Sequence, residues 1–290
     1  MTPTHFVTML KPEVMTASKA DEVLAETVRV LGEGGVTVLR TAMMPARRYG
    51  ELGFLRQHYP RLHRVAADGV RALSSSARRE LERFDVPIVA GAFEVAAWDA
   101  SLTATSLEAR CREAGIHKLG SGSYASVIDN MVVLNGFVPA LASSYLDSPS
   151  SVGLIECHSS REIADLRANL LGTLNPNTAA PNSLRGALAA VVGGLSEGRN
   201  GVHLSAGHLE GMVQAWRYFG AADGQSLEDT PLGRSLAEVG VSASAFAADH
   251  NITDESGDLV SPHGATEDLS RDEVVDLLRR WAALKEGVFA

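Results

Sequence analysis

The sequence predicts an α+β protein in which short apolar strands alternate with amphipathic helices. Residues 5–11, 36–40 and 151–157 are rich in apolar and β-branched side chains, which indicates buried strands. Residues 18–31 and the stretch that begins at Ser270 place apolar side chains at helical spacing instead. We therefore expect these strands and helices to pack into a common core.

Three further elements can be expected from local patterns. Pro45 is expected to open a helical stretch that ends near Tyr59, because proline favours the first turn of a helix. A helix is also expected from Ser159 or Ser160 to Leu171, with Glu162 closing a capping box on Ser159. Near the end of the chain, residues 253–262 have the composition of a turn or hairpin.

The composition is that of a globular protein with a sizeable core. The 290 residues are 45% hydrophobic and carry a formal net charge of −9. An acidic chain lacks the basic surface that nonspecific nucleic-acid binding requires, so we expect no nucleic-acid partner. Local clusters of arginine can still bind nucleotides. Cys111 and Cys157 are the two cysteines, too few for a disulfide scaffold.

Compartment and membrane association follow from hydropathy. The sequence has no apolar run of about 18 residues, so we expect no transmembrane helix and no membrane partner. The first residues, MTPTH, lack the basic start and apolar stretch of a secretory signal. These observations predict a cytoplasmic protein.

The most informative stretch is GRNGVHLS, residues 198–205. A neutral imidazole is nucleophilic at pH 7 and can form a covalent intermediate, so His203 is a candidate catalytic residue. Arg185 and Arg199 lie near it in the sequence, and cations of this kind stabilise a migrating phosphoryl group. The alternative is a histidine that only packs beside a glycine turn.

Three motifs occur in a fixed order along the chain. They are Lys11-Pro12-Glu13, then Asn175-Pro176 followed by Pro181 and Ser183-Leu184-Arg185-Gly186, then Gly198-Arg199-Asn200 with His203 three residues later. Together they resemble the active-site region of nucleoside diphosphate kinases. The resemblance implies a ferredoxin-like βαββαβ fold, an antiparallel sheet with helices on one face. It also implies that His203 carries a phosphoryl group between two nucleotides.

The resemblance assigns further residues to this site. It implies that Lys11 contacts phosphate and ribose, that Tyr59 lines the histidine's pocket, and that Asn200 bonds the ribose 3′-hydroxyl. It also places Ser205 beside the catalytic histidine. The remaining implied contacts to the nucleotide come from one base-stacking helix and two phosphate-binding segments: Phe137, Leu141, Arg167, Thr173 and Arg185.

The chain departs from the family pattern at two places in this site. Leu174 is inserted before Asn175, so either Arg167 and Thr173 keep their roles through a local bulge or these positions fall on Ala168 and Leu174. The family's histidine-orienting glutamate is replaced by Gln214, which can accept a hydrogen bond but carries no charge. Another residue, such as Glu210, is the alternative orienting partner.

Two smaller features lie beside the motifs. Leu204 replaces a family glycine next to the histidine and crowds it, and His208 is expected on the surface of a helix. The segment Gly120-Ser121-Gly122-Ser123-Tyr124 is expected to be an ordinary loop, because no Gly-Lys-Ser/Thr follows it as a phosphate-binding loop would require.

The resemblance divides the chain into three parts. Residues 1–62 and 134–222 form the kinase-like core, residues 63–133 an inserted subdomain, and residues 223–290 a C-terminal extension. We expect the insertion to shape substrate choice or assembly. The helix from Ser270 is expected to pack on the core or on another subunit.

These observations favour a phosphotransferase that uses a nucleoside triphosphate with Mg²⁺. The acceptor would be a nucleoside diphosphate or another phosphorylated small molecule, and the resemblance implies a homo-oligomer. Two alternatives stay open. One is a nucleotide-binding relative that has lost turnover and serves regulation or assembly. The other is a direct kinase or nucleotidyl transferase without a phosphohistidine.

Overall fold

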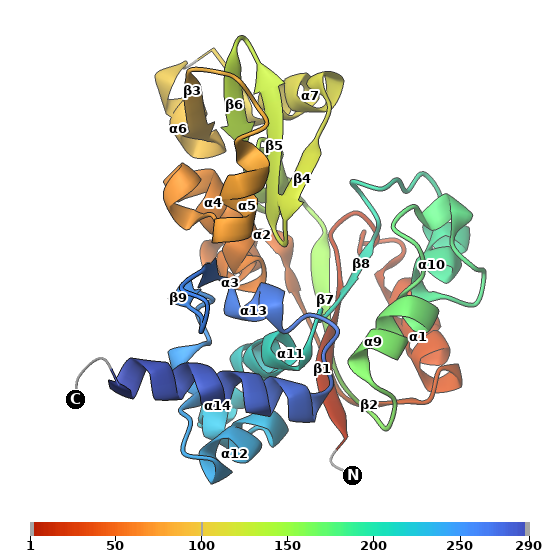
Figure 1. Ribbon diagram of the computed structural model, residues 1–290. Helices are drawn as coiled ribbons and strands as arrows, with labels where there is room; N and C mark the ends of the chain where they lie inside the picture. The colour runs from red at the N-terminus through yellow and green to blue at the C-terminus, as the bar shows by residue number, and fades with distance from the viewer. Residues whose placement is uncertain (1–2, 100, 288–290) are drawn as a thin grey trace. The chain divides into compact units, whose positions relative to one another are not determined.

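The computed structural model describes residues 3–99 and 101–287, which form two compact units (Figure 1). Unit 1 comprises Met1–Tyr49, Ser148–Ala247 and Thr266–Ala290, and unit 2 comprises Gly50–Asp147 and Ala248–Ala265. Residues 50–62, 134–147 and 248–265 are thus grouped with the predicted insertion. Each unit has its own sheet and its own core.

The sheet of unit 1 has four strands: β1 (Thr4–Leu10), β2 (Val36–Pro45), β7 (Ser151–Ser159) and β8 (Val202–Leu204). Their order across the sheet is β2-β7-β1-β8, and every neighbouring pair is antiparallel. β8 pairs with the C-terminal half of β1, with Met9 opposite His203. The strand predicted at residues 36–40 extends to Pro45.

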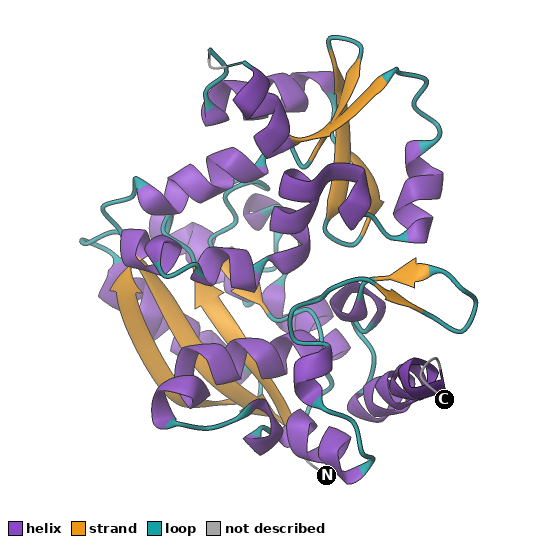
Figure 2. Ribbon diagram, turned by 90° about the vertical axis from the view of Figure 1, so that its left-hand side faces the viewer, coloured by secondary structure: helices purple, strands orange, loops and turns teal. Residues whose placement is uncertain are grey.

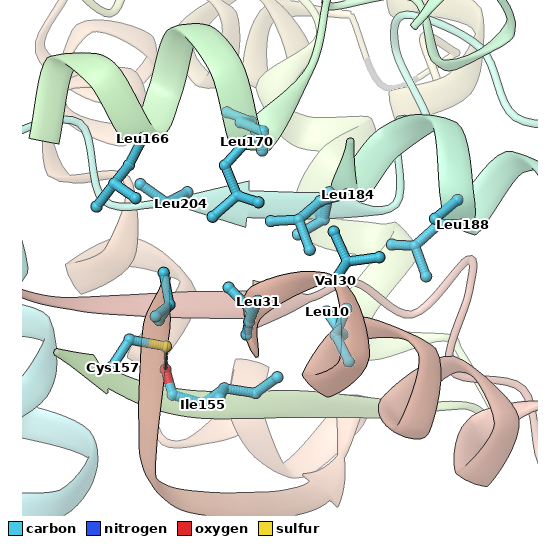
Figure 3. Packing of buried hydrophobic residues seen from close by; sticks show 14 of the residues in the cluster. Leu10, Val30, Leu31, Ile155, Cys157, Leu166, Leu170, Leu184, Leu188 and Leu204 are labelled. Carbon is cyan, nitrogen blue, oxygen red and sulfur yellow. Dashed lines mark hydrogen bonds between the residues drawn. The ribbon is translucent and has the colours of Figure 1, made fainter. Parts of the chain in front are cut away.

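One face of this sheet is covered by helices that come between its strands in the sequence. They are α1 (Ala20–Glu33), α9 (Ile163–Asp165), the π-helical turn η2 (Leu166–Leu171), the 3₁₀ turn η3 (Pro176–Thr178) and α10 (Leu184–Val192). Apolar side chains of the helices and strands interlock in the main core (Figure 3). Leu10, Leu31 and Leu188 are fully buried there, as is the free thiol of Cys157.

The opposite face carries the elements that follow β8 (Figure 1). They are α11 (His208–Ala215), η4 (Trp216–Gly220), η5 (Ala221–Asp223), η6 (Leu227–Asp229), α12 (Pro231–Glu238), η7 (Ala243–Ala245) and α14 (Arg271–Gly287). α11 lies so close to β1 that a Cβ added at Gly211 would be 2.6 Å from the His5 carbonyl oxygen. The expectation of helices on one face only is therefore corrected.

Unit 2 has a mixed sheet of order β3-β6-β5-β4 surrounded by helices (Figure 2). Its strands are β3 (Ile88–Gly91), β4 (His117–Gly120), β5 (Ser123–Ile128) and β6 (Met131–Leu134), and β3 pairs parallel to β6. Its helices are α3 (Phe54–His58), α4 (Pro60–Asp68), η1 (Gly69–Ala72), α5 (Ser75–Leu81), α6 (Ala92–Trp98), α7 (Ala104–Ala114), α8 (Val138–Leu146) and α13 (Pro262–Ala265). α2 (Ala46–Glu51) begins in unit 1 and ends in unit 2.

A buried ion pair ties residues 248–265 to the rest of unit 2. Arg61 on α4 donates from Nε to Asp249 Oδ2 at 3.1 Å, and Asp249 is fully buried. Ser261 Oγ and the His263 amide donate to Asp249 Oδ1 at 2.7 and 3.0 Å. The predicted hairpin lies within this segment, as β9 (Ile252–Thr253) and β10 (Leu259–Val260).

Several local expectations are corrected. No single helix runs from Pro45 to Tyr59, because Pro45 ends β2 and the left-handed residue Gly53 separates α2 from α3. The capping box on Ser159 does not form, because Ser159 is the last residue of β7 and its hydroxyl donates to Gly35 O. None of the described helices is both long and apolar enough to cross a membrane.

Candidate active site around His203

β8 places the imidazole of His203 on the face of the sheet opposite the main core. Side chains alternate along a strand, and Val202 and Leu204 both point into that core. His203 therefore points the other way, toward α11. Its side chain is 21% exposed, so the ring is partly open to solvent.

Glu210, on the first turn of α11, orients the ring. His203 Nε2 lies 2.9 Å from Glu210 Oε1. The same carboxylate oxygen accepts Gln214 Nε2 at 2.7 Å and the Ala206 amide at 3.3 Å. Of the two orienting partners considered from the sequence, it is Glu210 that contacts the imidazole, while Gln214 lies one helical turn further on and holds the carboxylate.

This contact selects a tautomer. A carboxylate accepts hydrogen bonds only, so Nε2 must carry the proton that it donates to Glu210. In the neutral ring the lone pair then resides on Nδ1, which becomes the nucleophilic nitrogen.

Ser205 connects Gln214 to the backbone of β1 and makes no described hydrogen bond to the imidazole. Its hydroxyl lies 2.7 Å from Gln214 Oε1 and 3.2 Å from the Val7 carbonyl, and it accepts the Val7 amide at 3.0 Å. The side chain is completely buried. The chain Val7–Ser205–Gln214–Glu210–His203 thus links the middle of β1 to the ring.

Lys11 and Asn200 meet at the end of β1, beside the strand pair that carries His203. Lys11 Nζ donates to Asn200 Oδ1 at 2.8 Å, and the Lys11 amide donates to Gly201 O at 2.9 Å. Glu13 Oε1 accepts the Gly201 amide at 3.1 Å. Gly201 has a left-handed φ of 78°, which favours glycine at this turn.

Arg185 adds a second positive charge near Lys11. It is the second residue of α10, and its Nη1 donates to the Gly172 carbonyl at 2.9 Å. Burial lowers the pKa of the Lys11 ammonium; Glu13 raises it and Arg185 lowers it further. The structure therefore brings together three residues predicted to bind nucleotide: Lys11, Asn200 and Arg185.

Arg167 and Thr173 have other partners. Arg167 Nη1 donates to Asp268 Oδ1 at 2.6 Å and to the Ala206 carbonyl at 3.0 Å, so it lies beside the segment that follows β8. Thr173 Oγ1 donates to Asn175 O at 3.1 Å within its own loop. Arg167 lies in the π-helical turn η2, and the left-handed Gly172 follows it.

The other three predicted residues belong to unit 2, whereas His203 belongs to unit 1. The ring of Tyr59 contacts that of His58 edge to face, with centroids 4.6 Å apart. Phe137 contacts Tyr124 in the same way at 5.5 Å and packs on the core of unit 2. Leu141 lies on α8, where its amide donates to the Phe137 carbonyl at 3.0 Å.

Two tyrosines that the sequence did not single out lie near Glu210. The hydroxyls of Tyr49 and Tyr218 are 2.6 Å apart. Burial raises the pKa of the Tyr218 phenol, and the charge of Glu210 acts in the same direction. The two tyrosines are 169 residues apart, so no local pattern could pair them. Tyr218 lies in the π-helical turn η4, a kind of distortion that is frequent at functional sites.

No cluster of three or more His, Cys, Asp or Glu side chains among the described residues could hold a metal ion. Mg²⁺ typically keeps several waters and binds through a nucleotide's phosphates with few protein ligands.

Comparison with known proteins gives distant structural neighbours only. No family model matches the chain, and no curated protein matches it. An NDP kinase from Pyrobaculum aerophilum aligns at 14% identity and a TM-score of 0.41, covering 77% of this chain and 100% of that one. Nucleoside diphosphate kinase from Encephalitozoon cuniculi aligns at 14% identity and 0.40, covering 79% and 97%. That of Aquifex aeolicus aligns at 13% identity and 0.36, covering 75% and 95%. Similarity of this degree assigns no activity to this chain.

Proposed function

We propose that this protein is a phosphotransferase in which His203 accepts a phosphoryl group from a nucleoside triphosphate and passes it on. The observation that carries the proposal is the contact between His203 Nε2 and Glu210, with Lys11, Arg185 and Asn200 gathered at the adjoining end of β1. A charged orienting group and a nearby pair of cations are what a phosphohistidine mechanism needs.

In the first step, the Nδ1 lone pair attacks the γ-phosphorus of the triphosphate. The N–P bond forms while the bond between this phosphorus and the bridging oxygen breaks, and the diphosphate leaves with that electron pair. The ring becomes positively charged, and the Glu210 carboxylate stabilises this charge through the Nε2 proton. In the second step, a terminal oxygen of the acceptor attacks the same phosphorus and the N–P bond breaks.

Lys11 and Arg185 are the proposed phosphate-binding pair. Burial is the main cause of the lowered pKa of Lys11, and the charge of Arg185 lowers it further. A polyphosphate bound between them would relieve the repulsion between the two cations. Asn200 would bind the ribose 3′-hydroxyl as the resemblance implies, which requires its amide to share or exchange the Lys11 contact.

Arg167 and Thr173 join the site in this proposal only if they exchange their present partners. In the present structure Arg167 Nη1 donates to Asp268 Oδ1 at 2.6 Å. This existing contact favours the second candidate, a nucleotide-binding protein without turnover. The resemblance also assigns nucleotide contacts to Tyr59, Phe137 and Leu141, which belong to unit 2.

The fold of unit 1 is proposed to be a ferredoxin-like core. Its element order, β1-α1-β2 and then β7-α9/α10-β8, is a βαββαβ sequence. Most of unit 2 lies between β2 and β7 in the sequence. Its proposed role is to select the acceptor, a nucleoside diphosphate or a related phosphorylated molecule. Use of Mg²⁺ with the triphosphate, homo-oligomeric assembly and a cytoplasmic location complete the proposal.

The test is incubation with γ-labelled nucleoside triphosphate and Mg²⁺, followed by acid and base treatment of the protein. We expect an adduct that is labile in acid and stable in base, present in the wild type and absent in His203→Ala. His117→Ala, which removes an exposed histidine of unit 2, is the matched control and should label normally. Nucleotide binding without an adduct would support the second candidate instead.

A further inference from the structure

Unit 1 has a second group of basic side chains, away from His203. His5 of β1, His208 of α11 and Arg271 of α14 line a hollow of about 220 Å³, part of which is open to solvent. Pro3, Met212, Pro231 and Leu232 complete its lining. The proposed phosphoryl-transfer residues do not take part in it.

Each of the three basic side chains has a buried nitrogen without a hydrogen bond among the described residues. These atoms are His5 Nδ1, His208 Nε2 and Arg271 Nη1. His208, expected on the surface, is only 5% exposed, and its Nε2 lies 3.5 Å from Glu162 Oε2, longer than a good hydrogen bond. Arg271 Nη1 is a donor in every protonation state, and the two imidazole nitrogens can both donate when their rings are doubly protonated, so the lining can then offer three hydrogen bonds to one acceptor.

The backbone favours a negative charge at the same place. α11 begins at His208, and its N-cap, Gly207, provides no side-chain hydrogen bond to the first turn. α12 begins at Pro231 and α14 at Arg271, but the Thr230 and Ser270 hydroxyls already accept first-turn amides of these helices, so α11 provides the uncapped N-terminus at the hollow. The N-terminus of a helix carries a partial positive charge and unpaired amides, which attract anions.

The size of the hollow limits the ligand. Its enclosed part has room for about one water molecule. We propose that the hollow binds one small anion, of the size of chloride or bromide, between His5, His208 and Arg271. A bound anion would fix the start of α11 against β1.

The acidic groups near the hollow determine whether a substitution should strengthen or weaken anion binding. Glu162 and Asp272 lie near His208 and Arg271, but both are well exposed and therefore screened by water. Glu156 is buried, and Arg40 neutralises it. Removing Glu162 should strengthen binding of an anion, whereas it would weaken binding of a metal cation at the same imidazoles.

Anion binding should also tighten as the pH falls, because an anion favours the protonated form of the His208 imidazole. His5 Nε2 contacts Glu156 Oε1 at 2.8 Å, so Nδ1 becomes a donor when the ring is doubly protonated. The charged and titratable groups around His5 are Glu156 and His158. Those around His208 are Glu162, Arg271 and Asp272, and burial lowers the His208 pKa.

The experiment compares chloride and bromide with gluconate at constant sodium concentration. We expect the unfolding midpoint of the whole protein to rise and saturate with either halide but not with gluconate, and bromide to give an anomalous diffraction peak between the three side chains. An equal effect of gluconate, stabilisation by phosphate or sulfate alone, or a bromide peak elsewhere would overturn the proposal.

Single substitutions test whether the halide binds at this hollow. Arg271→Gln removes a charged donor and should weaken halide binding by about tenfold or more. Glu162→Gln should tighten it, and this exposed change should not impair folding. Arg279→Gln, on the exposed side of the same helix, is the control and should bind like the wild type. Weaker halide binding in Glu162→Gln, or zinc binding that this variant abolishes, would contradict an anion site.

Discussion

His203 Nε2 and Glu210 Oε1 lie 2.9 Å apart, and this contact joins strand β8 to helix α11 on the face of the sheet opposite the main core. It supplies a negative charge to a ring that would become cationic in the proposed phosphorylation. The same carboxylate oxygen accepts a hydrogen bond from Gln214 Nε2 at 2.7 Å, and this second bond helps to fix its position. The predictions below begin from this pair.

Glu210→Gln should slow formation of the phosphohistidine by about 10- to 100-fold, because a hydrogen bond to a charged group is worth about 1.5–3 kcal/mol. The variant keeps the shape of the side chain and removes its charge. Rapid-quench measurement of single-turnover labelling checks the rate. Glu238→Gln, an exposed change on α12, should leave it unaltered. An unchanged rate in Glu210→Gln would mean that this carboxylate does not assist the transfer.

Ser205→Ala should reduce the free energy of unfolding by about 1–3 kcal/mol, because it leaves the buried Val7 amide without the Ser205 acceptor. Labelling of His203 should persist, since the hydroxyl belongs to the supporting network. Urea denaturation measures the loss, with the exposed Ser244→Ala as control. Full stability combined with lost labelling would instead assign Ser205 a direct part in the chemistry.

His203 and Glu210 show how much of this site the sequence could predict. The motif around residues 198–205 identified His203 as the candidate residue, and the structure places it on β8 between Val202 and Leu204, which point into the core. Gln214 and Glu210 are four residues apart on one helix, so the predicted position identified the correct helical face. Which of them meets the ring depends on where α11 begins relative to β8, and that is set by packing against β1.

Partners that are distant in the sequence could not be predicted. Arg167 and Asp268 are 101 residues apart, and Arg61 and Asp249 are 188 apart. No local sequence pattern indicates either ion pair. The strands β1, β2 and β7 and the helices α1 and α14 were predictable because their signals are periodic. Strands β4 and β5 were not predicted, since residues 120–124 were expected to be an ordinary loop, and the assignment of residues 248–265 to unit 2 depends on the Arg61–Asp249 ion pair.

Asp249→Asn should destabilise the protein by about 3–5 kcal/mol, because the buried guanidinium of Arg61 would lose its counter-charge. Asp258→Asn is the matched control in the same segment, since Asp258 pairs with Arg79 at the surface. Its loss should have a much smaller effect, because surface ion pairs contribute little to stability. Equal effects of the two substitutions, measured by urea denaturation, would show that the buried pair does not hold this segment.

The stability of unit 1 should depend on Glu156 at acid pH. Burial alone would raise the pKa of this carboxyl, but His5 and Arg40 together lower it to about 2. Because the folded pKa lies below the unfolded one, the unfolded chain binds more protons in between, and stability falls as the pH drops from about 5 toward 2. The contribution is on the order of 2–3 kcal/mol at neutral pH.

Glu156→Gln tests this linkage. The free energy of unfolding should differ between the wild type and the variant at pH 7, and this difference should shrink steadily as the pH falls through 4 to 3. Urea titrations at each pH provide the values. A difference that stays constant over this range would contradict a depressed carboxyl pKa at this position.

The most direct test of phosphoryl transfer through His203 is a single-turnover chase. The protein is labelled from γ-labelled nucleoside triphosphate, freed of nucleotide, and mixed with unlabelled nucleoside diphosphate or another phosphorylated acceptor. The account predicts that the label lies on the peptide containing His203 and moves quantitatively to an acceptor. Label that never enters the protein, or that enters His203→Ala equally well, would contradict it.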